Sequence, residues 1–205
     1  MLNQRYLFVS KSLMLVICLA LQSTVASMNN VESVLTDQDV KDPQVKYNLP
    51  INCLLPERDR CNLTVTIPKE FRLLQEGALI EFIPKDDKNE DDWSRIITLQ
   101  PLRGKKASAY IITSDLKNLV SKIAKEVMVL EHTNQDLKAY KKSTLLISYT
   151  LNNKREILFA QYFSGPSDCA GCQYTVRLDN SLNNLLQLAG CIQEFITTNI
   201  RITKF

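Results

Sequence analysis

Cys169 and Cys172 form the one pair of residues whose spacing could do chemistry. They enclose Ala170 and Gly171 in a C-x-x-C motif. Such a motif can exchange electrons with other thiols when a helix N-terminus lowers the pKa of its first cysteine. However, residues 173–178 alternate between polar and apolar side chains, which predicts a strand and no helix dipole. Only 33 residues follow Cys172, too few to complete a redox domain of that kind. The sequence favours a structural motif, and a thiol-disulfide redox protein is the alternative.

Histidine and glycine are scarce enough to exclude whole classes of site. His132 is the single histidine, so any catalytic triad or Cys-His pair would have to include it. The five glycines are too far apart for a dinucleotide or Walker phosphate loop. One C-x-x-C with one distant histidine lacks a full set of zinc ligands, and the acidic stretch 85–92 lacks the calcium-loop pattern. We therefore predict no metal and no cofactor, and we place His132 on the surface just past a helix end.

The first 26 residues have the features of a secretory signal peptide. Arg5 and Lys11 precede the apolar run 13–21, and small residues follow up to Ser27. The run is about half of the roughly 20 residues that a membrane span requires. We predict cleavage after Ala26 or Ser27. The mature protein would then be exported, periplasmic or extracellular, with no stable insertion in a membrane.

Removal of the signal peptide changes the charge of the chain. It takes away two of the 25 basic residues and none of the 22 acidic ones, which leaves a net charge of about +1. Nucleic-acid binding depends on basic residues that neutralise phosphates. A nearly neutral mature chain therefore predicts no nucleic-acid partner.

Five cysteines remain after cleavage, and in an exported protein they are candidates for disulfides. They are Cys53, Cys61, Cys169, Cys172 and Cys191. Proximity favours a bridge from Cys53 to Cys61 around a polar turn. The second bridge joins Cys191 to Cys169 or Cys172; otherwise Cys169 pairs with Cys172, and Cys191 stays free. Either arrangement leaves one unpaired thiol.

The mature chain is expected to contain a polar flexible leader, residues 27–50, and a single domain, residues 51–205. Short alternating or apolar segments bounded by turn residues predict strands in that domain. The expected strands span residues 63–67, 78–83, 93–99, 144–151, 156–163 and 174–178, with an edge strand near Ile200. Asn152-Asn153 supplies a tight turn between the fourth and fifth of these strands.

Two helices are expected among these strands. Ser114-Asp115 can cap a long helix whose apolar residues recur at three- and four-residue spacing as far as Leu130. A shorter helix begins near Asp179 or Ser181 and continues to Ile192. The pattern predicts an α+β fold, in which an antiparallel sheet carries one long and one short helix on one face, with disulfides stapling the domain.

A segment of about 20 residues around Trp93 resembles a motif of small exported proteobacterial proteins. It comprises Glu81-Phe82-Ile83-Pro84, the acidic loop 85–92, and the strand that begins Trp93-Ser94-Arg95. These proteins are largely uncharacterised and include proteins of intracellular pathogens. The resemblance implies a strand-loop-strand hairpin with the tryptophan packed at its return, then a helix and a cysteine-bearing hairpin. It implies no catalytic residue.

Three functional hypotheses follow from these observations. The favoured one is an exported, non-enzymatic binding or assembly protein that uses a sheet face or edge, has a protein partner, and supports the envelope or host contacts of a bacterium. The second is the redox protein based on Cys169 and Cys172. The third, a hydrolase using a serine or an acid pair, can be assigned to no particular residues.

Overall fold

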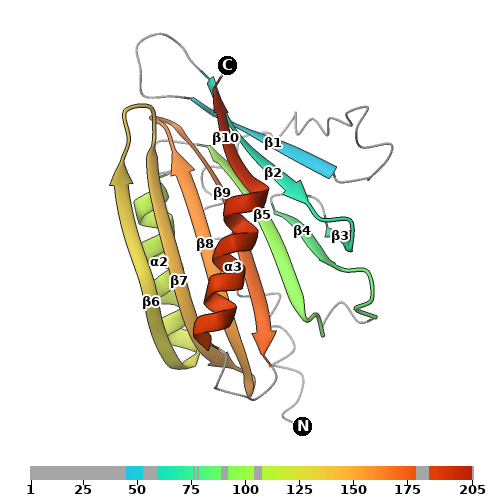
Figure 1. Ribbon diagram of the computed structural model, residues 1–205. Helices are drawn as coiled ribbons and strands as arrows, with labels where there is room; N and C mark the ends of the chain where they lie inside the picture. Colours follow the sequence, from blue (N-terminus) through green and yellow to red (C-terminus); the bar gives the residue numbers. More distant parts are fainter. Residues whose placement is uncertain are drawn as a thin grey trace.

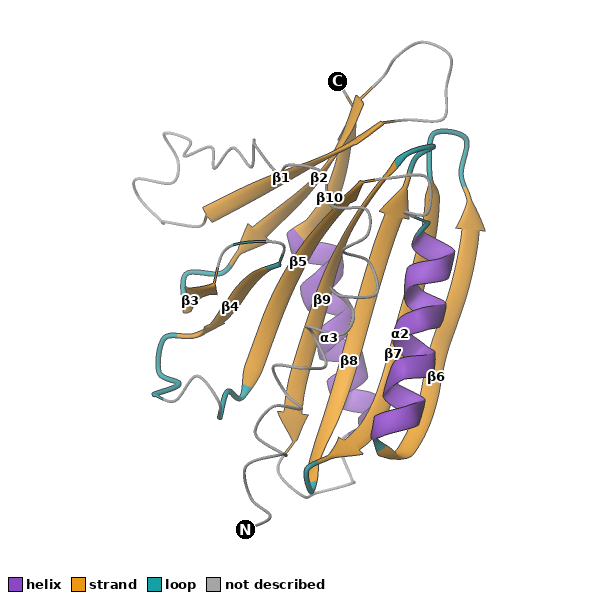
Figure 2. Cartoon of the chain, turned by 180° about the vertical axis from the view of Figure 1, so that it is seen from behind, coloured by secondary structure: helices purple, strands orange, loops and turns teal. Residues whose placement is uncertain are grey.

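The chain folds into three layers built mainly from strands. The computed structural model describes residues 45–52, 60–75, 77, 79–88, 92–103, 108–178 and 185–204. Helix α2 (Ala109–Ile123) covers one face of a seven-stranded sheet (Figure 2). Helix α3 (Leu185–Asn199) and a three-stranded sheet lie on the opposite face (Figure 1). Every paired strand in both sheets is antiparallel.

The larger sheet contains most of the strands. Its spatial order is β3 (Phe71–Gln75), β4 (Ile80–Pro84), β5 (Arg95–Arg103), β9 (Asp168–Leu178), β8 (Lys154–Ser164), β7 (Lys141–Leu151) and β6 (Lys125–Asp136). Strands β7, β8 and β9 form a continuous meander. Asn152 and Asn153 connect β7 to β8 with φ angles of 52° and 61°. These positive angles fit the tight hairpin turn that the sequence predicts.

The smaller sheet brings both ends of the described chain together. Its order is β1 (Val45–Asn52), β2 (Arg60–Ile67) and β10 (Ile200–Lys204). β1 takes in residues 45–50, which the sequence analysis assigns to the leader. β10 pairs with β2 as the edge strand expected near Ile200.

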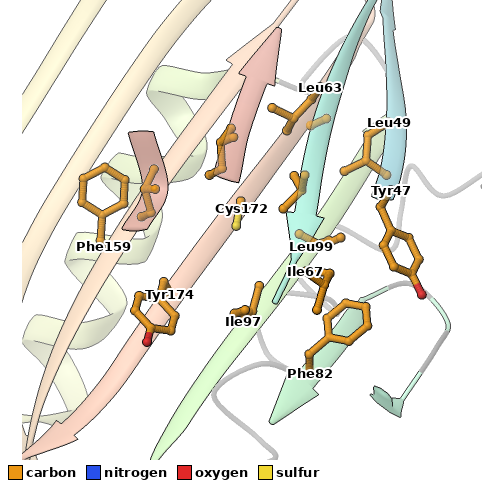
Figure 3. Packing of buried hydrophobic residues seen from close by; sticks show 14 of the residues in the cluster. Tyr47, Leu49, Leu63, Ile67, Phe82, Ile97, Leu99, Phe159, Cys172 and Tyr174 are labelled. Atoms are coloured by element: carbon orange, nitrogen blue, oxygen red, sulfur yellow. The ribbon is translucent and has the colours of Figure 1, made fainter. Parts of the chain in front are cut away.

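Each face of the main sheet has its own hydrophobic core. The core beneath α2 includes Ile112, Leu116, Leu145 and Ile147. The larger core lies between the two sheets and beneath α3, where Leu49 and Leu63 from the smaller sheet meet Leu99 and Cys172 from the larger one (Figure 3). Because successive residues of a strand point to opposite faces, the central strands β8 and β9 contribute to both cores.

The expected fold class is wrong in three respects. Strands dominate the described chain, so the protein is β-rich rather than α+β. The two helices lie on opposite faces of the main sheet, not on one face, because strands β7 to β9 are apolar on both faces and each face needs a cover. The cysteines of the C-x-x-C motif form no disulfide, as both thiols are free and buried.

The long helix is also displaced from its expected position. It spans Ala109–Ile123, and the residues from Lys125 onward form β6. The helix starts early because its N-terminus is satisfied from elsewhere in the fold. The backbone N–H of Ala109 donates to the Ser164 hydroxyl on β8 at 3.0 Å. It ends early because Ala124 is extended and Glu126 has a φ of 49°, which turns the chain back along β7.

Candidate functional site

The C-x-x-C motif lies within strand β9 rather than in a loop. Three residues apart in a strand, Cys169 and Cys172 point to opposite faces of the sheet. Cys169 belongs to the core beneath α2, whereas Cys172 belongs to the core between the sheets, as Figure 3 shows for its sulfur. This geometry excludes a bridge between them and the pairing of either with Cys191. The predicted bridge between Cys53 and Cys61 lies outside the described residues and side chains.

Both motif thiols are held in their unreactive form. Burial raises the pKa of the Cys172 thiol to about 12. Burial raises the pKa of Cys169 as well, and the adjacent charge of Asp168 adds to the rise. A redox cysteine needs a lowered pKa and access to a substrate disulfide. Neither thiol has these properties in this fold.

The glycine of the motif has a packing role. The ring of Tyr162, on the neighbouring strand β8, lies across Gly171. A Cβ atom at position 171 would overlap ring carbons Cδ1 and Cε1 of Tyr162. Glycine in a strand often marks such a close approach. The ring therefore extends across β9 and brings its hydroxyl toward β5.

Five buried side chains form a polar face on strands β4, β5, β9 and β8, and we call this set the polar face. Tyr162 donates a hydrogen bond to Gln100 Oε1 at 2.5 Å, and Gln173 Nε2 donates to the Tyr162 hydroxyl at 2.5 Å. Thr98 donates to Glu81 Oε1 at 3.4 Å. Burial raises the pKa of Glu81, and the bond from Thr98 offsets part of the rise.

Gln100 is incompletely bonded within this face. Its Nε2 atom is the single buried side-chain nitrogen or oxygen without a partner in the described part of the chain. Only 1% of Gln100 is exposed, so the missing bond costs about 1–3 kcal/mol. The same burial keeps a partner protein from contacting the polar face directly.

Strand β6 offers the most accessible backbone of the main sheet. It is the last strand of the sheet and twelve residues long, and it pairs with β7 alone. We call its side away from β7 the β6 edge. Three apolar side chains are exposed beside it, namely Ile123 (36%), Met128 (49%) and Val129 (40%). Exposed strand edges are sites where another chain can add a strand.

The two halves of β6 differ in regularity. The register with β7 shifts between Lys125 and Met128 and again between Val129 and Glu131. From Glu131 to Asp136 the pairing is uninterrupted. Bulges twist an edge and hinder uncontrolled pairing. The first half therefore offers apolar side chains, and the second half offers a regular backbone.

Helix α2 contacts β6 and β7 through polar side chains that we call the α2–β6 link. Tyr110 donates to Asp136 Oδ1 at 2.9 Å, and the Thr113 hydroxyl lies 3.2 Å from His132 Nε2 and 2.6 Å from the Ser143 hydroxyl. His132 thus faces α2 from within β6, and its predicted place just past a helix end is wrong. The sequence analysis missed this link, because its members come from three separate elements.

The tryptophan of the acidic hairpin is fixed by an ion-pair cluster. The hairpin itself is β4 and β5. Arg177, on β9, lies 3.7 Å from the Trp93 ring centroid and donates to Glu156 Oε1 at 2.9 Å. Glu156 is buried, and such a charge requires a partner. We interpret this cluster as structural.

Two searches of the described residues bear on other kinds of site. They found no group of three or more His, Cys, Asp or Glu residues able to hold a metal ion. They also found no helix of the length and apolar character needed to cross a membrane.

Comparisons with known proteins give structural similarity alone. No family model and no curated protein matches the chain. The solved structure of cyanobacterial PsbP (CyanoP) from Synechocystis sp. PCC 6803 aligns with a TM-score of 0.48 and 6% identity, covering 69% of this chain and 86% of that one. LpqN, involved in cell envelope biogenesis of Mycobacterium tuberculosis, aligns with a TM-score of 0.43 and 17% identity, covering 83% and 97%. At these TM-scores and identities, neither similarity supports an argument about function.

Proposed function

We propose that the chain is an exported, non-enzymatic binding or assembly protein, periplasmic or secreted, that serves the envelope or the host contacts of a bacterium. Its partner is a protein that docks on the β6 edge. The observation that carries this proposal is the exposed edge itself, twelve residues long and flanked by Ile123, Met128 and Val129. Main-chain hydrogen bonds to such an edge supply affinity, and neighbouring side chains supply specificity.

The reactive groups that sequence analysis singled out support a non-enzymatic reading. Cys169 and Cys172 are buried on opposite faces with raised pKa values. His132 is engaged with Thr113. We expect both thiols to react with a colorimetric disulfide reagent only after denaturation, with no acceleration of insulin reduction. Rapid reaction in the native state would revive the redox alternative.

Export can be tested on the protein as cells produce it. We expect the N-terminus of the mature protein, sequenced from the periplasmic fraction and the culture medium, to follow Ala26 or Ser27. A chain that still begins at Met1 would contradict export.

Docking can be tested with two variants matched in exposure. Met128→Lys places a charge beside the β6 edge, whereas Ile111→Lys places one on α2 at a residue of almost equal exposure, 50% against 49%. A tagged wild-type protein isolated from its native envelope should retain a stoichiometric protein partner. We expect Ile111→Lys to retain this partner and Met128→Lys to lose it. Equal retention by both variants would show that the β6 edge is not the docking surface.

A further inference from the structure

The contacts that hold β6 against α2 differ in kind from those that hold β7. α2 packs on β7 through buried apolar residues such as Leu145 and Ile147. Toward β6 it offers the hydroxyls of Tyr110 and Thr113, which meet Asp136 and His132. Apolar packing is insensitive to protons, whereas a contact through histidine responds to pH in the physiological range. The edge strand is therefore attached partly through a titratable group.

The hydrogen bonds around Thr113 leave little freedom to the proton of its hydroxyl. Ser143 donates to Asn134 Oδ1 at 2.6 Å, so the Ser143 hydroxyl oxygen can accept from Thr113. The carbonyl of Ala109 is a competing acceptor at 3.1 Å. When His132 is neutral, Nε2 can accept from Thr113 or donate to it. Once His132 is protonated, Nε2 can only donate, and the Thr113 proton must go to Ser143 or Ala109.

The charged groups around His132 come from three elements. On α2, Lys117 is near enough for its charge to act on the imidazole. On β6, Glu131 accepts a bond from Thr133, and Asp136 is engaged by Tyr110 and by Lys141 of β7. On β7, Lys142 lies over the Phe163 ring. Lys117 therefore opposes a second positive charge, while the nearby carboxylates are already engaged.

We propose that the α2–β6 link is a proton-sensitive device, in which protonation of His132 loosens β6 from α2. Because β6 carries the proposed docking surface, and as far as that proposed function holds, acid would then weaken partner binding or release the partner. The loosening itself is a property of the free protein and can be measured without any partner.

The direction of the pH effect follows from the environment of the imidazole. Burial lowers the pKa of His132, and the charge of Lys117 lowers it further. The folded protein thus binds a proton less readily at this site than the unfolded chain, whose histidine titrates near pH ~6.5. The stabilisation is fully present above that pH and is lost as the pH falls through the folded-state pKa.

Amide hydrogen exchange of the mature protein, without a partner, tests the proposal. We compare protection factors, which correct for the effect of pH on the chemistry of exchange, at about pH 7.5 and about pH 5, on either side of the histidine pKa. We expect protection of β6 to fall several-fold at the lower pH, while β8 in the middle of the sheet keeps its protection. His132→Gln, which stays neutral at both values, should abolish the fall.

Two controls keep the test decisive. Lys117→Gln removes the opposing charge from the helix surface and should make the fall smaller, even if His132→Gln folds poorly. Asp136→Asn tests the other titratable group of the link and should leave most of the fall in place. An unchanged fall in Lys117→Gln or His132→Gln, or no fall in the wild type, would overturn the proposal. Loss of the partner from Met128→Lys at neutral pH tests the proposed function separately.

Discussion

The polar face and the α2–β6 link lie on the same side of the main sheet, yet acid should act on them in opposite directions. Burial raises the pKa of Glu81 in the polar face and lowers the pKa of His132 in the link. In both cases burial disfavours the charged form, which is an anion in one region and a cation in the other. The same physical cause thus favours the polar face at low pH and the link at high pH.

The two regions also differ in how fully their hydrogen bonds are satisfied. In the polar face, Gln100 Nε2 is buried without a partner, although Tyr162 and Gln173 lie beside it. In the link, each hydroxyl has a printed partner on another element. Buried polar groups contribute strongly to the cost of a mutation, whereas exposed ones contribute little. Mutations in the polar face should therefore cost more than equivalent mutations in the link.

The largest expected effect comes from Gly171→Ala. The added methyl would overlap the Tyr162 ring, which has to move and carry its hydroxyl away from Gln100. Overpacking of this kind costs about 3 kcal/mol of unfolding free energy. Gly190→Ala is the matched control, because a Cβ there meets nothing within 4 Å and glycine disfavours a helix by about 1 kcal/mol. Urea denaturation should show one variant destabilised and the other stabilised. Similar midpoints would contradict the close approach of Tyr162 to Gly171.

A smaller effect is expected from Tyr162→Phe. The variant keeps the ring but leaves Gln100 Oε1 and Gln173 Nε2 without their hydroxyl partner, which should cost about 2 kcal/mol. Tyr110→Phe removes a comparable but exposed bond to Asp136 and should cost about 0.5 kcal/mol. Thermal unfolding of both variants measures the difference. If the two costs are equal, burial does not distinguish the two regions.

The smallest effects should appear in the pH dependence of stability. Glu81 has a raised pKa, so its contribution to stability is present below its ordinary pKa and is lost as pH rises through the folded-state value. Glu81→Gln should therefore increase stability at neutral pH and leave the acid side largely unchanged. His132→Gln should instead reduce the loss of stability on acidification. Denaturant midpoints measured across the pH range would show both limbs. A shift of the same limb in both variants would contradict the opposite responses.

Local pattern was sufficient to locate most of the strands. The expected strands at 63–67, 78–83, 93–99, 144–151 and 156–163 correspond to β2, β4, β5, β7 and β8 within a few residues. The Asn152-Asn153 turn is present, since asparagine tolerates the positive φ that the turn requires. These features depend on neighbours in sequence, which is why a single sequence contains them.

Strand β6 could not be found by the same reasoning. Val127 and Leu130 continue the helical spacing of Leu116 and Val120, so periodicity alone extends the helix into β6. The real boundaries depend on Ser164, which satisfies the helix N-terminus from another strand, and on pairing with β7. Tertiary contacts override local preference in such segments.

The candidate sites show the same division. The sequence places His132 and the two motif cysteines, but their roles depend on which face of a strand they occupy. Gln100 and Tyr162 are 62 positions apart and have no sequence signal that joins them. Met128 and Val129 look like core residues until the edge position of β6 exposes them.

The sequence by itself determined the alternation of most strands, the tight asparagine turn, the near neutrality of the mature chain and the absence of phosphate-binding glycine loops. Only the tertiary structure decided that the helices lie on opposite faces, that the C-x-x-C thiols point apart and that His132 meets α2. Composition and periodicity record the preferences of neighbouring residues. The partners of a side chain across a sheet, and the water that burial removes from it, are set only when distant strands pair.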